Sequence, residues 1–397
     1  MQVVYAKQPF PTAWKSAIFL AGPTPRSNEV ESWRPEALRL LEEMNYDGVV
    51  FVPEDEGGEF QGSYQDQVDW ERDGLNFADV IVFWVPREMG TMPALTTNVE
   101  FGRWVTSGKA DLGHPPEAAK MRYLDWLYTE ESGGYYEATD TLYETLGLAL
   151  QRIADWSERV SSYREGGARY VPLMIWQTPA FQAWYETLTI GNGNRLDEAR
   201  QLWVFSMPKA RLVFSWVLWV KVWIESEKRY KENEWIFARS DISTVCLYHE
   251  PPDATSIEET EIVLIREFRS PCRNIEGFVY ELPGGSSMKE GEDPLEVASH
   301  EVEEETSLEI PANRFRSLNH RQVAATLSTH HAHLYAARLT EAEMDKAKLL
   351  AKWGTAHGVE DDSERTYVEV YTFGDILRSE WVDWSMLGMI AKALMED

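Results

Sequence analysis

Residues 281–305 carry the pattern that most restricts how this chain can fold. The segment opens with Glu281-Leu-Pro-Gly-Gly285, where a proline and two glycines predict a tight turn. Asp293 and Pro294 then predict the start of a helix, because aspartate caps helix N-termini and proline is tolerated in the first turn. We therefore expect a turn that leads into an acidic helix.

Three carboxylates of that helix predict a metal site. They belong to Glu301, Glu304 and Glu305, whose offsets of i, i+3 and i+4 put them on one helix face. Like charges on one face repel, so the arrangement is costly unless a cation lies among them. Mg²⁺ and Mn²⁺ prefer carboxylate oxygens, and Mg²⁺ usually holds substrate phosphates as well. We expect Mg²⁺ (or Mn²⁺) here; a solvated acidic helix face is the plainer alternative.

The same segment resembles the signature of the Nudix hydrolases. That signature reads Gly, five residues, Glu, seven residues, then Arg-Glu-apolar-x-Glu-Glu-x-Gly-apolar. Here seven residues separate Glu292 from His300, but six separate it from Gly285. His300 stands in place of the arginine and Ser307 in place of the glycine.

The resemblance implies metal-dependent hydrolysis of a nucleoside diphosphate linked to a moiety X. It places Glu301, Glu304 and Glu305 on the metal, with Glu304 and Glu305 also in catalysis. Gly284 and Gly285 would contact the substrate.

Composition sets outer bounds on function. At 397 residues and 44% apolar content, the chain can form roughly two or three cores. A net charge of −28 argues against nucleic acid polymers and anionic membranes as partners. Cys246 and Cys272 provide neither a disulfide framework nor a zinc spacing, which suits a reducing compartment. We expect a cytoplasmic protein without a membrane span that handles small molecules.

The N-terminal third alternates strand and helix signals. Apolar runs at residues 17–21, 49–52 and 80–85 each end at proline or Gly-Pro, and helical spacing is visible over residues 31–44. Such alternation predicts βαβ units in a doubly wound parallel sheet. Ligands bind beyond the carboxyl ends of such strands, which is where Gly22 and Pro23 fall.

Short motifs in this third resemble the nucleoside 2-deoxyribosyltransferases and relatives that cleave the N-glycosidic bond of nucleoside monophosphates. The matching positions are Ala21-Gly22-Pro23, Glu71 before an Ala-Asp-apolar strand, and Glu100 in a Glu-x-Gly context. The resemblance implies a flavodoxin-like domain over residues 1–150. The family often has a tyrosine on its first strand, where this chain has Ile18-Phe19.

This resemblance also implies roles for individual residues. Glu100 would be the nucleophile, Glu71 the acid that protonates the departing base, and Asp73 a weaker candidate for that acid. Gly22 and Pro23 would contact the substrate. The plainer alternatives are a surface position for Glu71 and a dipole-favoured first-turn position for Glu100.

Residues 151–232 are rich in tryptophan. Trp216, Trp219 and Trp223 have helical spacing, so we predict a largely helical connector with a packed core. Stacking of a base on one of these rings is the alternative function.

Strand patterns return at residues 241–248 and 261–266. With the Nudix resemblance they predict an α/β/α sandwich with a mixed sheet over residues 233–397. Arg266 and Arg269 predict a clamp on a diphosphate or carboxylate, or alternatively surface salt bridges with Glu267 or Glu276.

Two further groups of residues support only weaker predictions of function. His330, His331 and His333 favour substrate contact or packing over a transition-metal site, because His330 points away from the other two on a strand. Glu360 or Glu364 could serve as a general base in the resemblance, with a solvated acidic loop as the alternative.

Together these patterns predict a bifunctional hydrolase acting on a nucleotide or nucleoside. We hypothesise that the Nudix half acts first and that the other half then releases a free base, or transfers the deoxyribosyl group to a second base. A nucleotide-sensing protein whose N-terminal domain binds without turnover is the alternative. The sequence leaves a homo-oligomer open.

Overall fold

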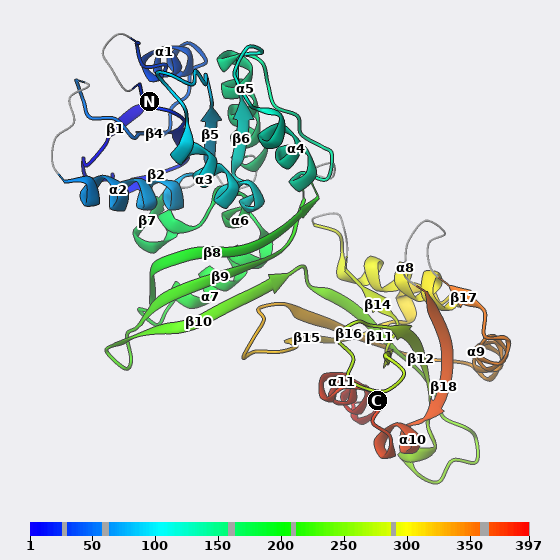
Figure 1. Cartoon of the computed structure of the whole chain (residues 1–397). Helices are drawn as coiled ribbons and strands as arrows, with labels where there is room; N and C mark the ends of the chain where they lie inside the picture. The colour runs from blue at the N-terminus through cyan, green and yellow to red at the C-terminus, as the bar shows by residue number, and fades with distance from the viewer. Residues whose placement is uncertain are drawn as a thin grey trace. The chain divides into compact units, whose positions relative to one another are not determined.

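The computed structural model describes residues 1–25, 30–57, 63–157, 163–207, 212–286, 291–357 and 365–396. The chain divides into two compact units, Met1–Ala238 and Arg239–Asp397. Each unit is described by itself (Figure 1). Within the described ranges, no helix has the length and apolar character needed to cross a membrane.

Unit 1 contains a five-stranded parallel sheet with the order β1-β4-β3-β5-β6. Its strands are β1 (Gln2–Tyr5), β3 (Ala17–Ala21), β4 (Val49–Val52), β5 (Val80–Trp84) and β6 (Ala110–Gly113). The predicted strands at 17–21 and 49–52 are confirmed, and the third ends one residue early. The chain crosses from one side of β3 to the other between β4 and β5, which makes the β3/β5 edge the switch point of the sheet.

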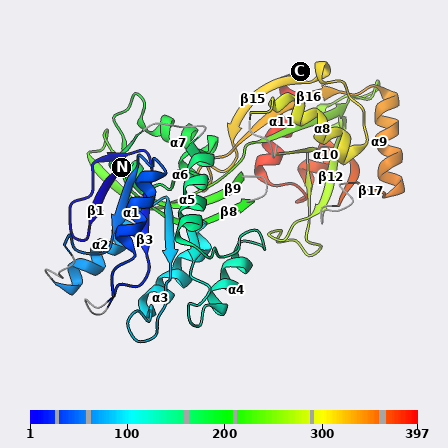
Figure 2. The same ribbon diagram turned by 90° about the horizontal axis from the view of Figure 1, so that it is seen from above.

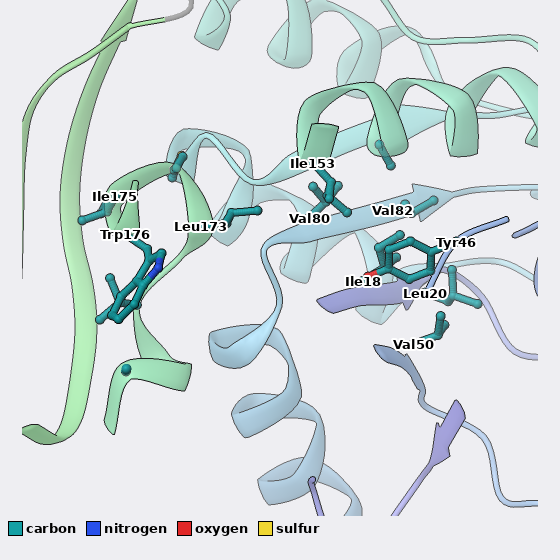
Figure 3. Packing of buried hydrophobic residues seen from close by; sticks show 14 of the residues in the cluster. Ile18, Leu20, Tyr46, Val50, Val80, Val82, Ile153, Leu173, Ile175 and Trp176 are labelled. Carbon is teal, nitrogen blue, oxygen red and sulfur yellow. The ribbon is translucent and has the colours of Figure 1, made fainter. Parts of the chain in front are cut away.

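Helices cover both faces of this sheet, as predicted. They are α1 (Arg34–Glu43), α2 (Tyr64–Phe77), α3 (Leu95–Trp104), α4 (Arg122–Glu131) and α5 (Leu142–Ser157). On one face α1 and α5 lie side by side (Figure 2), and Ile153 of α5 packs on Val80 in a core that also contains Val82 (Figure 3). On the other face Trp70 of α2 and Phe101 of α3 join a core with Phe83. The fold is a doubly wound α/β domain consistent with a flavodoxin-like arrangement.

The predicted helical connector is wrong. After the short helices α6 (Leu173–Trp176) and α7 (Pro179–Thr189), the chain forms an antiparallel sheet of β8 (Arg195–Met207), β9 (Leu212–Ile224) and β10 (Arg229–Arg239). The buried positions Trp216, Leu218 and Val220 follow a period of two, which is the strand period. The spacing of the three tryptophans alone fits a helix. The segment is rich in β-branched and aromatic residues, which favour strands, and this composition outweighed the spacing.

A buried ion pair ties this later part of unit 1 to the parallel sheet. Asp79, which precedes β5, accepts hydrogen bonds from the backbone N–H of Ala17 at 2.8 Å and of Leu173 at 2.7 Å. Arg164 of β7 (Arg164–Glu165) donates to both Asp79 oxygens, and both side chains are fully buried. β7 pairs with β2 (Ala13–Trp14), and η2 (Gly166–Tyr170) follows it.

Unit 2 is an α/β/α sandwich with a mixed sheet. The strands lie in the order β15-β16-β11-β12-β18-β17, with β13 beside β12 and β14 beside β11; β11 and β16 are parallel. They are β11 (Ile242–His249), β12 (Glu261–Phe268), β13 (Phe278–Glu281), β14 (Gly284–Gly285), β15 (Arg316–Gln322), β16 (His331–Arg338), β17 (Ala356–His357) and β18 (Thr366–Thr372).

Two helices pack on each face of this sheet. Helices α8 (Pro294–Thr306) and α9 (Glu341–Trp353) bury Val302 and Ala347 against one face. Helices α10 (Phe373–Arg378) and α11 (Trp384–Met395) bury Phe373 and Ile390 against the other. Asp293 caps α8 and Pro294 begins it, as predicted.

Candidate functional site

The switch point of unit 1 depends on Gly22, which follows β3. Its φ is +152°, and a Cβ there would lie 2.2 Å from the carbonyl oxygen of Trp84 at the end of β5. A larger residue is therefore excluded where the two strand ends meet. The Gly22 carbonyl accepts a hydrogen bond from Arg34 at 2.8 Å, and the Pro23 carbonyl accepts one from the indole of Trp33 at 3.1 Å.

Arg34 places a buried positive charge at this edge of the parallel sheet. Its guanidinium is 1% exposed and donates to the Leu20 carbonyl at 3.1 Å as well as to Gly22. It also forms an ion pair with Glu54, which follows β4, at 2.5 Å. Burial lowers the pKa of Arg34, while the charges of Glu54, Glu71 and Glu100 oppose the shift. Sequence reasoning missed Arg34; its position at the start of a helix facing the Gly-Pro loop was the available signal.

Glu71 lies on α2 and is held by another residue of the same helix. The Gln67 amide donates to a Glu71 carboxylate oxygen at 2.7 Å and to the Pro53 carbonyl at 3.2 Å. Burial raises the pKa of Glu71, and the Gln67 hydrogen bond and the charge of Arg34 oppose this. Gln67 was also missed, although its i, i+4 offset from Glu71 predicts contact on a helix.

Glu100 lies on α3, within electrostatic range of both Glu71 and Arg34. Burial, followed by the charge of Glu71, raises the pKa of Glu100 to about 7, and Arg34 opposes the shift. The fold thus brings two acids from α2 and α3 together beside one arginine from α1. A pair of carboxyls with raised pKa values is suited to acid–base and nucleophilic chemistry.

Asp73 has different surroundings. It pairs with the neighbouring Arg72 at 3.1 Å and is 45% exposed. Two residues along a helix correspond to a rotation of roughly 200°, so Asp73 and Glu71 occupy different faces of α2.

In unit 2, the Gly284-Gly285 turn lies against two carboxylates of α8. The Gly284 N–H donates to Glu305 at 2.8 Å, and a Cβ on Gly285 would lie 2.5 Å from a Glu301 oxygen. Burial raises the pKa of Glu305 to about 9; the Gly284 hydrogen bond opposes this, and the charges of Glu301, Glu281 and Glu267 add to it.

Glu304 and the end of α8 differ from this buried turn. Glu304 is 33% exposed and lies 3.5 Å from the His300 ring nitrogen. Ser307 ends α8 in the left-handed conformation with φ +54°. The glycine of the Nudix pattern would adopt that conformation more readily than serine does.

The two arginines predicted as a clamp lie on opposite faces of the sheet. Arg269 pairs with Glu267 at 2.7 Å and lies 3.8 Å from Glu281, both of which raise the pKa of Glu305. Arg266 pairs with Glu369 at 2.9 Å, and its guanidinium lies over the Phe278 and Tyr367 rings. Successive strand residues point to opposite faces, so Arg266 shares the face covered by α10 and α11.

The histidines gather at one end of the sheet. His320 stacks on His333 with ring centroids 5.1 Å apart, and His333 lies 3.5 Å from Asp241. Among the residues that the structure describes, no group of three or more His, Cys, Asp or Glu side chains is placed to hold a metal ion. Glu360 and Glu364 lie outside the described residues.

A comparison with known families gives a match in the N-terminal part of unit 1. Residues 15–117 match the family described as "Nucleoside 2-deoxyribosyltransferase like". The match includes Gly22, Glu71 and Glu100, and it supports an N-terminal domain of this kind with a nucleoside-processing role, by glycosyl transfer or hydrolysis, on small-molecule nucleosides. It does not extend into unit 2. A comparison with curated proteins gives no match.

Proposed function

We propose that unit 1 cleaves the N-glycosidic bond of a nucleoside or nucleoside monophosphate, with Glu100 as nucleophile and Glu71 as acid. The observation that carries the proposal is the meeting of these two partly buried carboxyls beside Arg34 at the switch point of the sheet. The family match over residues 15–117 supports it.

The reaction takes two steps. The ionised Glu100 attacks the anomeric carbon, the bond to the base breaks, and protonated Glu71 gives its proton to the leaving base. Water then attacks the glycosyl ester of Glu100 and gives a proton to Glu71, which restores both groups and releases the sugar. A second base in place of water gives transfer instead of hydrolysis.

Arg34 lies near both acids. Its charge opposes the rise in the pKa of each acid, so it stabilises the single negative charge that the pair carries before Glu100 attacks. The hydrogen bonds from the Arg34 guanidinium to backbone carbonyls hold its charge in a fixed position.

The test is release of free base, followed by mass spectrometry across a panel of nucleosides and nucleoside monophosphates. Glu100→Gln is expected to lower the rate by about 10³-fold or more, and Glu71→Gln by about 10²-fold. Glu36→Gln, which alters an exposed carboxylate paired with Arg39, serves as the matched control. Binding of a nucleotide to the wild type without any base release would favour the sensor alternative; adding a second base separates transfer from hydrolysis.

We also propose that unit 2 hydrolyses a nucleoside diphosphate linked to a moiety X. The observation that favours this is the Gly284-Gly285 turn lying against Glu301 and Glu305. The donor set fits Mg²⁺ or Mn²⁺, because carboxylate oxygens are preferred ligands and a cation would offset the charges that raise the pKa of Glu305. Glu301, Glu304 and Glu305 are not grouped as a metal site among the described residues, so on this proposal the three carboxylates come together when the cation binds. The metal would then stabilise diphosphate charge and activate water.

The second proposal predicts metal-dependent release of a nucleoside monophosphate or a ribose phosphate. Glu304→Gln and Glu305→Gln should each abolish the metal-dependent rate, and Glu303→Gln, an exposed acid of the same helix, should not. If the two halves act in sequence, the wild type releases free base from the diphosphate substrate. Glu100→Gln should then accumulate the phosphorylated fragment. Diphosphate cleavage that proceeds with no free base from any monophosphate would rule out consecutive action of the two halves.

A further inference from the structure

A cavity of about 1070 Å³ lies in unit 1, and it is not built from the acids described above. Among the residues that line it, Asn76 lies in the last turn of α2, four residues before β5, Ser107 lies three residues before β6, and Ala110 begins β6. Glu71 and Glu100, by contrast, belong to the edge where the strands end. The volume suits a small organic ligand, for which pockets of roughly 300–1,000 Å³ are usual.

Most of the cavity wall lies beyond the family match. The last residues of α4, the last turns of α5 and the paired strands β8 and β9 all contribute, and each follows residue 117. The three-stranded sheet of β8, β9 and β10 lies beneath the parallel-sheet layer in Figure 1 and supplies one side of the wall.

Seven aromatic residues contribute to this wall. They are Trp104, Tyr128, Tyr135, Tyr136, Trp156, Trp203 and Phe205. The Trp203 and Phe205 rings are 49% and 48% exposed and lie parallel within 8°, with centroids 6.2 Å apart. Large aromatic rings are usually covered, so two half-exposed parallel rings at a cavity present a surface on which a planar ligand can stack.

Arginines accompany the rings. Arg103 and Arg200 line the cavity, and each lies over a tryptophan ring, at 5.7 Å from Trp104 and 5.5 Å from Trp219. Within the described ranges, neither of these two guanidinium groups forms an ion pair with a carboxylate, whereas Arg152 pairs with buried Asp111 at 2.9 Å. Both side chains are exposed, so an anionic ligand group can reach either guanidinium without an ion pair having to break.

We propose that this cavity is a second nucleotide-binding site, in which Trp203 and Phe205 stack the base and Arg103 and Arg200 bind the phosphate. Aromatic rings with adjacent arginines are the groups that bind bases and phosphates together. The acids Glu130 and Glu131 also line the cavity and can accept hydrogen bonds from ribose hydroxyls or base amino groups. A nucleic acid polymer is disfavoured as the occupant because the net charge of the chain repels extended phosphate chains.

The cavity and the acid pair share one element. Arg103 follows Glu100 by one helical turn on α3. A ligand bound in the cavity therefore contacts the helix that carries the proposed nucleophile. We expect binding of that ligand to regulate the reaction at Glu100. The binding site itself does not depend on the proposed function.

The test is calorimetric titration of the full-length Glu100→Gln protein, which prevents turnover, with the four common ribonucleoside 5′-monophosphates, their nucleosides and inorganic phosphate. Trp203→Ala is expected to weaken monophosphate binding by about tenfold or more, because stacking on one ring is lost. Trp126→Ala, which removes an exposed tryptophan of α4 outside the cavity, is the matched control and should leave binding unchanged.

A separate variant tests the proposed phosphate contact. Arg200→Gln should weaken monophosphate binding about tenfold and leave nucleoside binding within about twofold. Thermal unfolding of each variant checks that the fold is retained. Monophosphate binding that is equal in Trp203→Ala, Arg200→Gln and the parent, or no monophosphate binding at all, would overturn the proposal. Since the readout is binding, loss of base release in the wild type would leave this result standing.

Discussion

Glu100 in unit 1 and Glu305 in unit 2 are both partly buried carboxyls with raised pKa values, yet their surroundings have opposite charge. Glu100 lies near Arg34, whose cation opposes the rise. Glu305 lies near Glu301, Glu281 and Glu267, whose charges add to the rise, and the Gly284 N–H opposes it. Unit 1 therefore balances its acids with a built-in cation, whereas unit 2 gathers acids that a bound cation would balance.

The largest expected effect tests whether the charges of unit 1 are internally balanced. Arg164→Met leaves Asp79 buried without its cation, so we expect the free energy of unfolding of unit 1 to fall by about 3–5 kcal/mol. Chemical denaturation measures it. Arg39→Met breaks two exposed ion pairs of α1 and should cost far less, because solvent screens both pairs. Equal losses in the two variants would contradict the argument.

Glu305→Gln tests the opposite situation in unit 2. With a folded pKa of about 9, Glu305 keeps a proton that the unfolded chain has lost above pH 4.5, so its contribution to stability falls as pH rises toward 9. At pH 8 without metal, Glu305→Gln should raise the free energy of unfolding by about 1–3 kcal/mol. Mg²⁺ should stabilise the wild type, increasingly with pH, and should not stabilise the variant. A variant that is less stable than the wild type without metal would count against this account.

The pH dependence of base release sharpens the role of Glu100. As a nucleophile Glu100 must be ionised, whereas Glu71 must be protonated, so the two titrations act in opposite directions in the wild type. In Glu71→Gln only Glu100 titrates, and kcat/KM should rise about tenfold across the two pH units centred on its pKa. Arg34→Met on that background removes the opposing cation and should move the midpoint upward. A rate that falls with pH in Glu71→Gln would assign Glu100 to proton donation instead.

The smallest expected effect compares two helix ends within unit 2. Helix α8 ends at Ser307 with φ +54°, and α9 ends at Gly354 with φ +61°. Serine is strained in this conformation, so Ser307→Gly should raise the free energy of unfolding by about 0.5 kcal/mol after the extra freedom of glycine in the unfolded chain is allowed for. The reciprocal change, Gly354→Ser, should lower it by a similar amount. The hydrogen bond of Ser307 to His357 at 3.1 Å is lost in the first variant and would reduce the gain.

Local patterns predicted many elements of this chain well. The runs at residues 17–21 and 49–52 became β3 and β4, and Asp293-Pro294 began α8, because apolar runs and capping residues act within a few positions. The prediction of a helical connector was wrong for the same reason, because it relied on a local pattern. The spacing of Trp216, Trp219 and Trp223 fits a helix locally, but pairing of β9 with β8 over a long register decides the structure.

The sequence by itself determined where Glu71, Glu100, Glu301 and Glu305 stand in their motifs, and which segments form the strands and helices that carry them. Only the tertiary structure decided their electrostatic surroundings. Arg34 reaches the acid pair because α1 packs beside the β3/β5 edge, and Arg266 is separated from Glu305 because neighbouring strand residues face opposite sides of the sheet. Burial and the distance between charges depend on residues far apart in the chain, so no local pattern can specify the pKa values that the site uses.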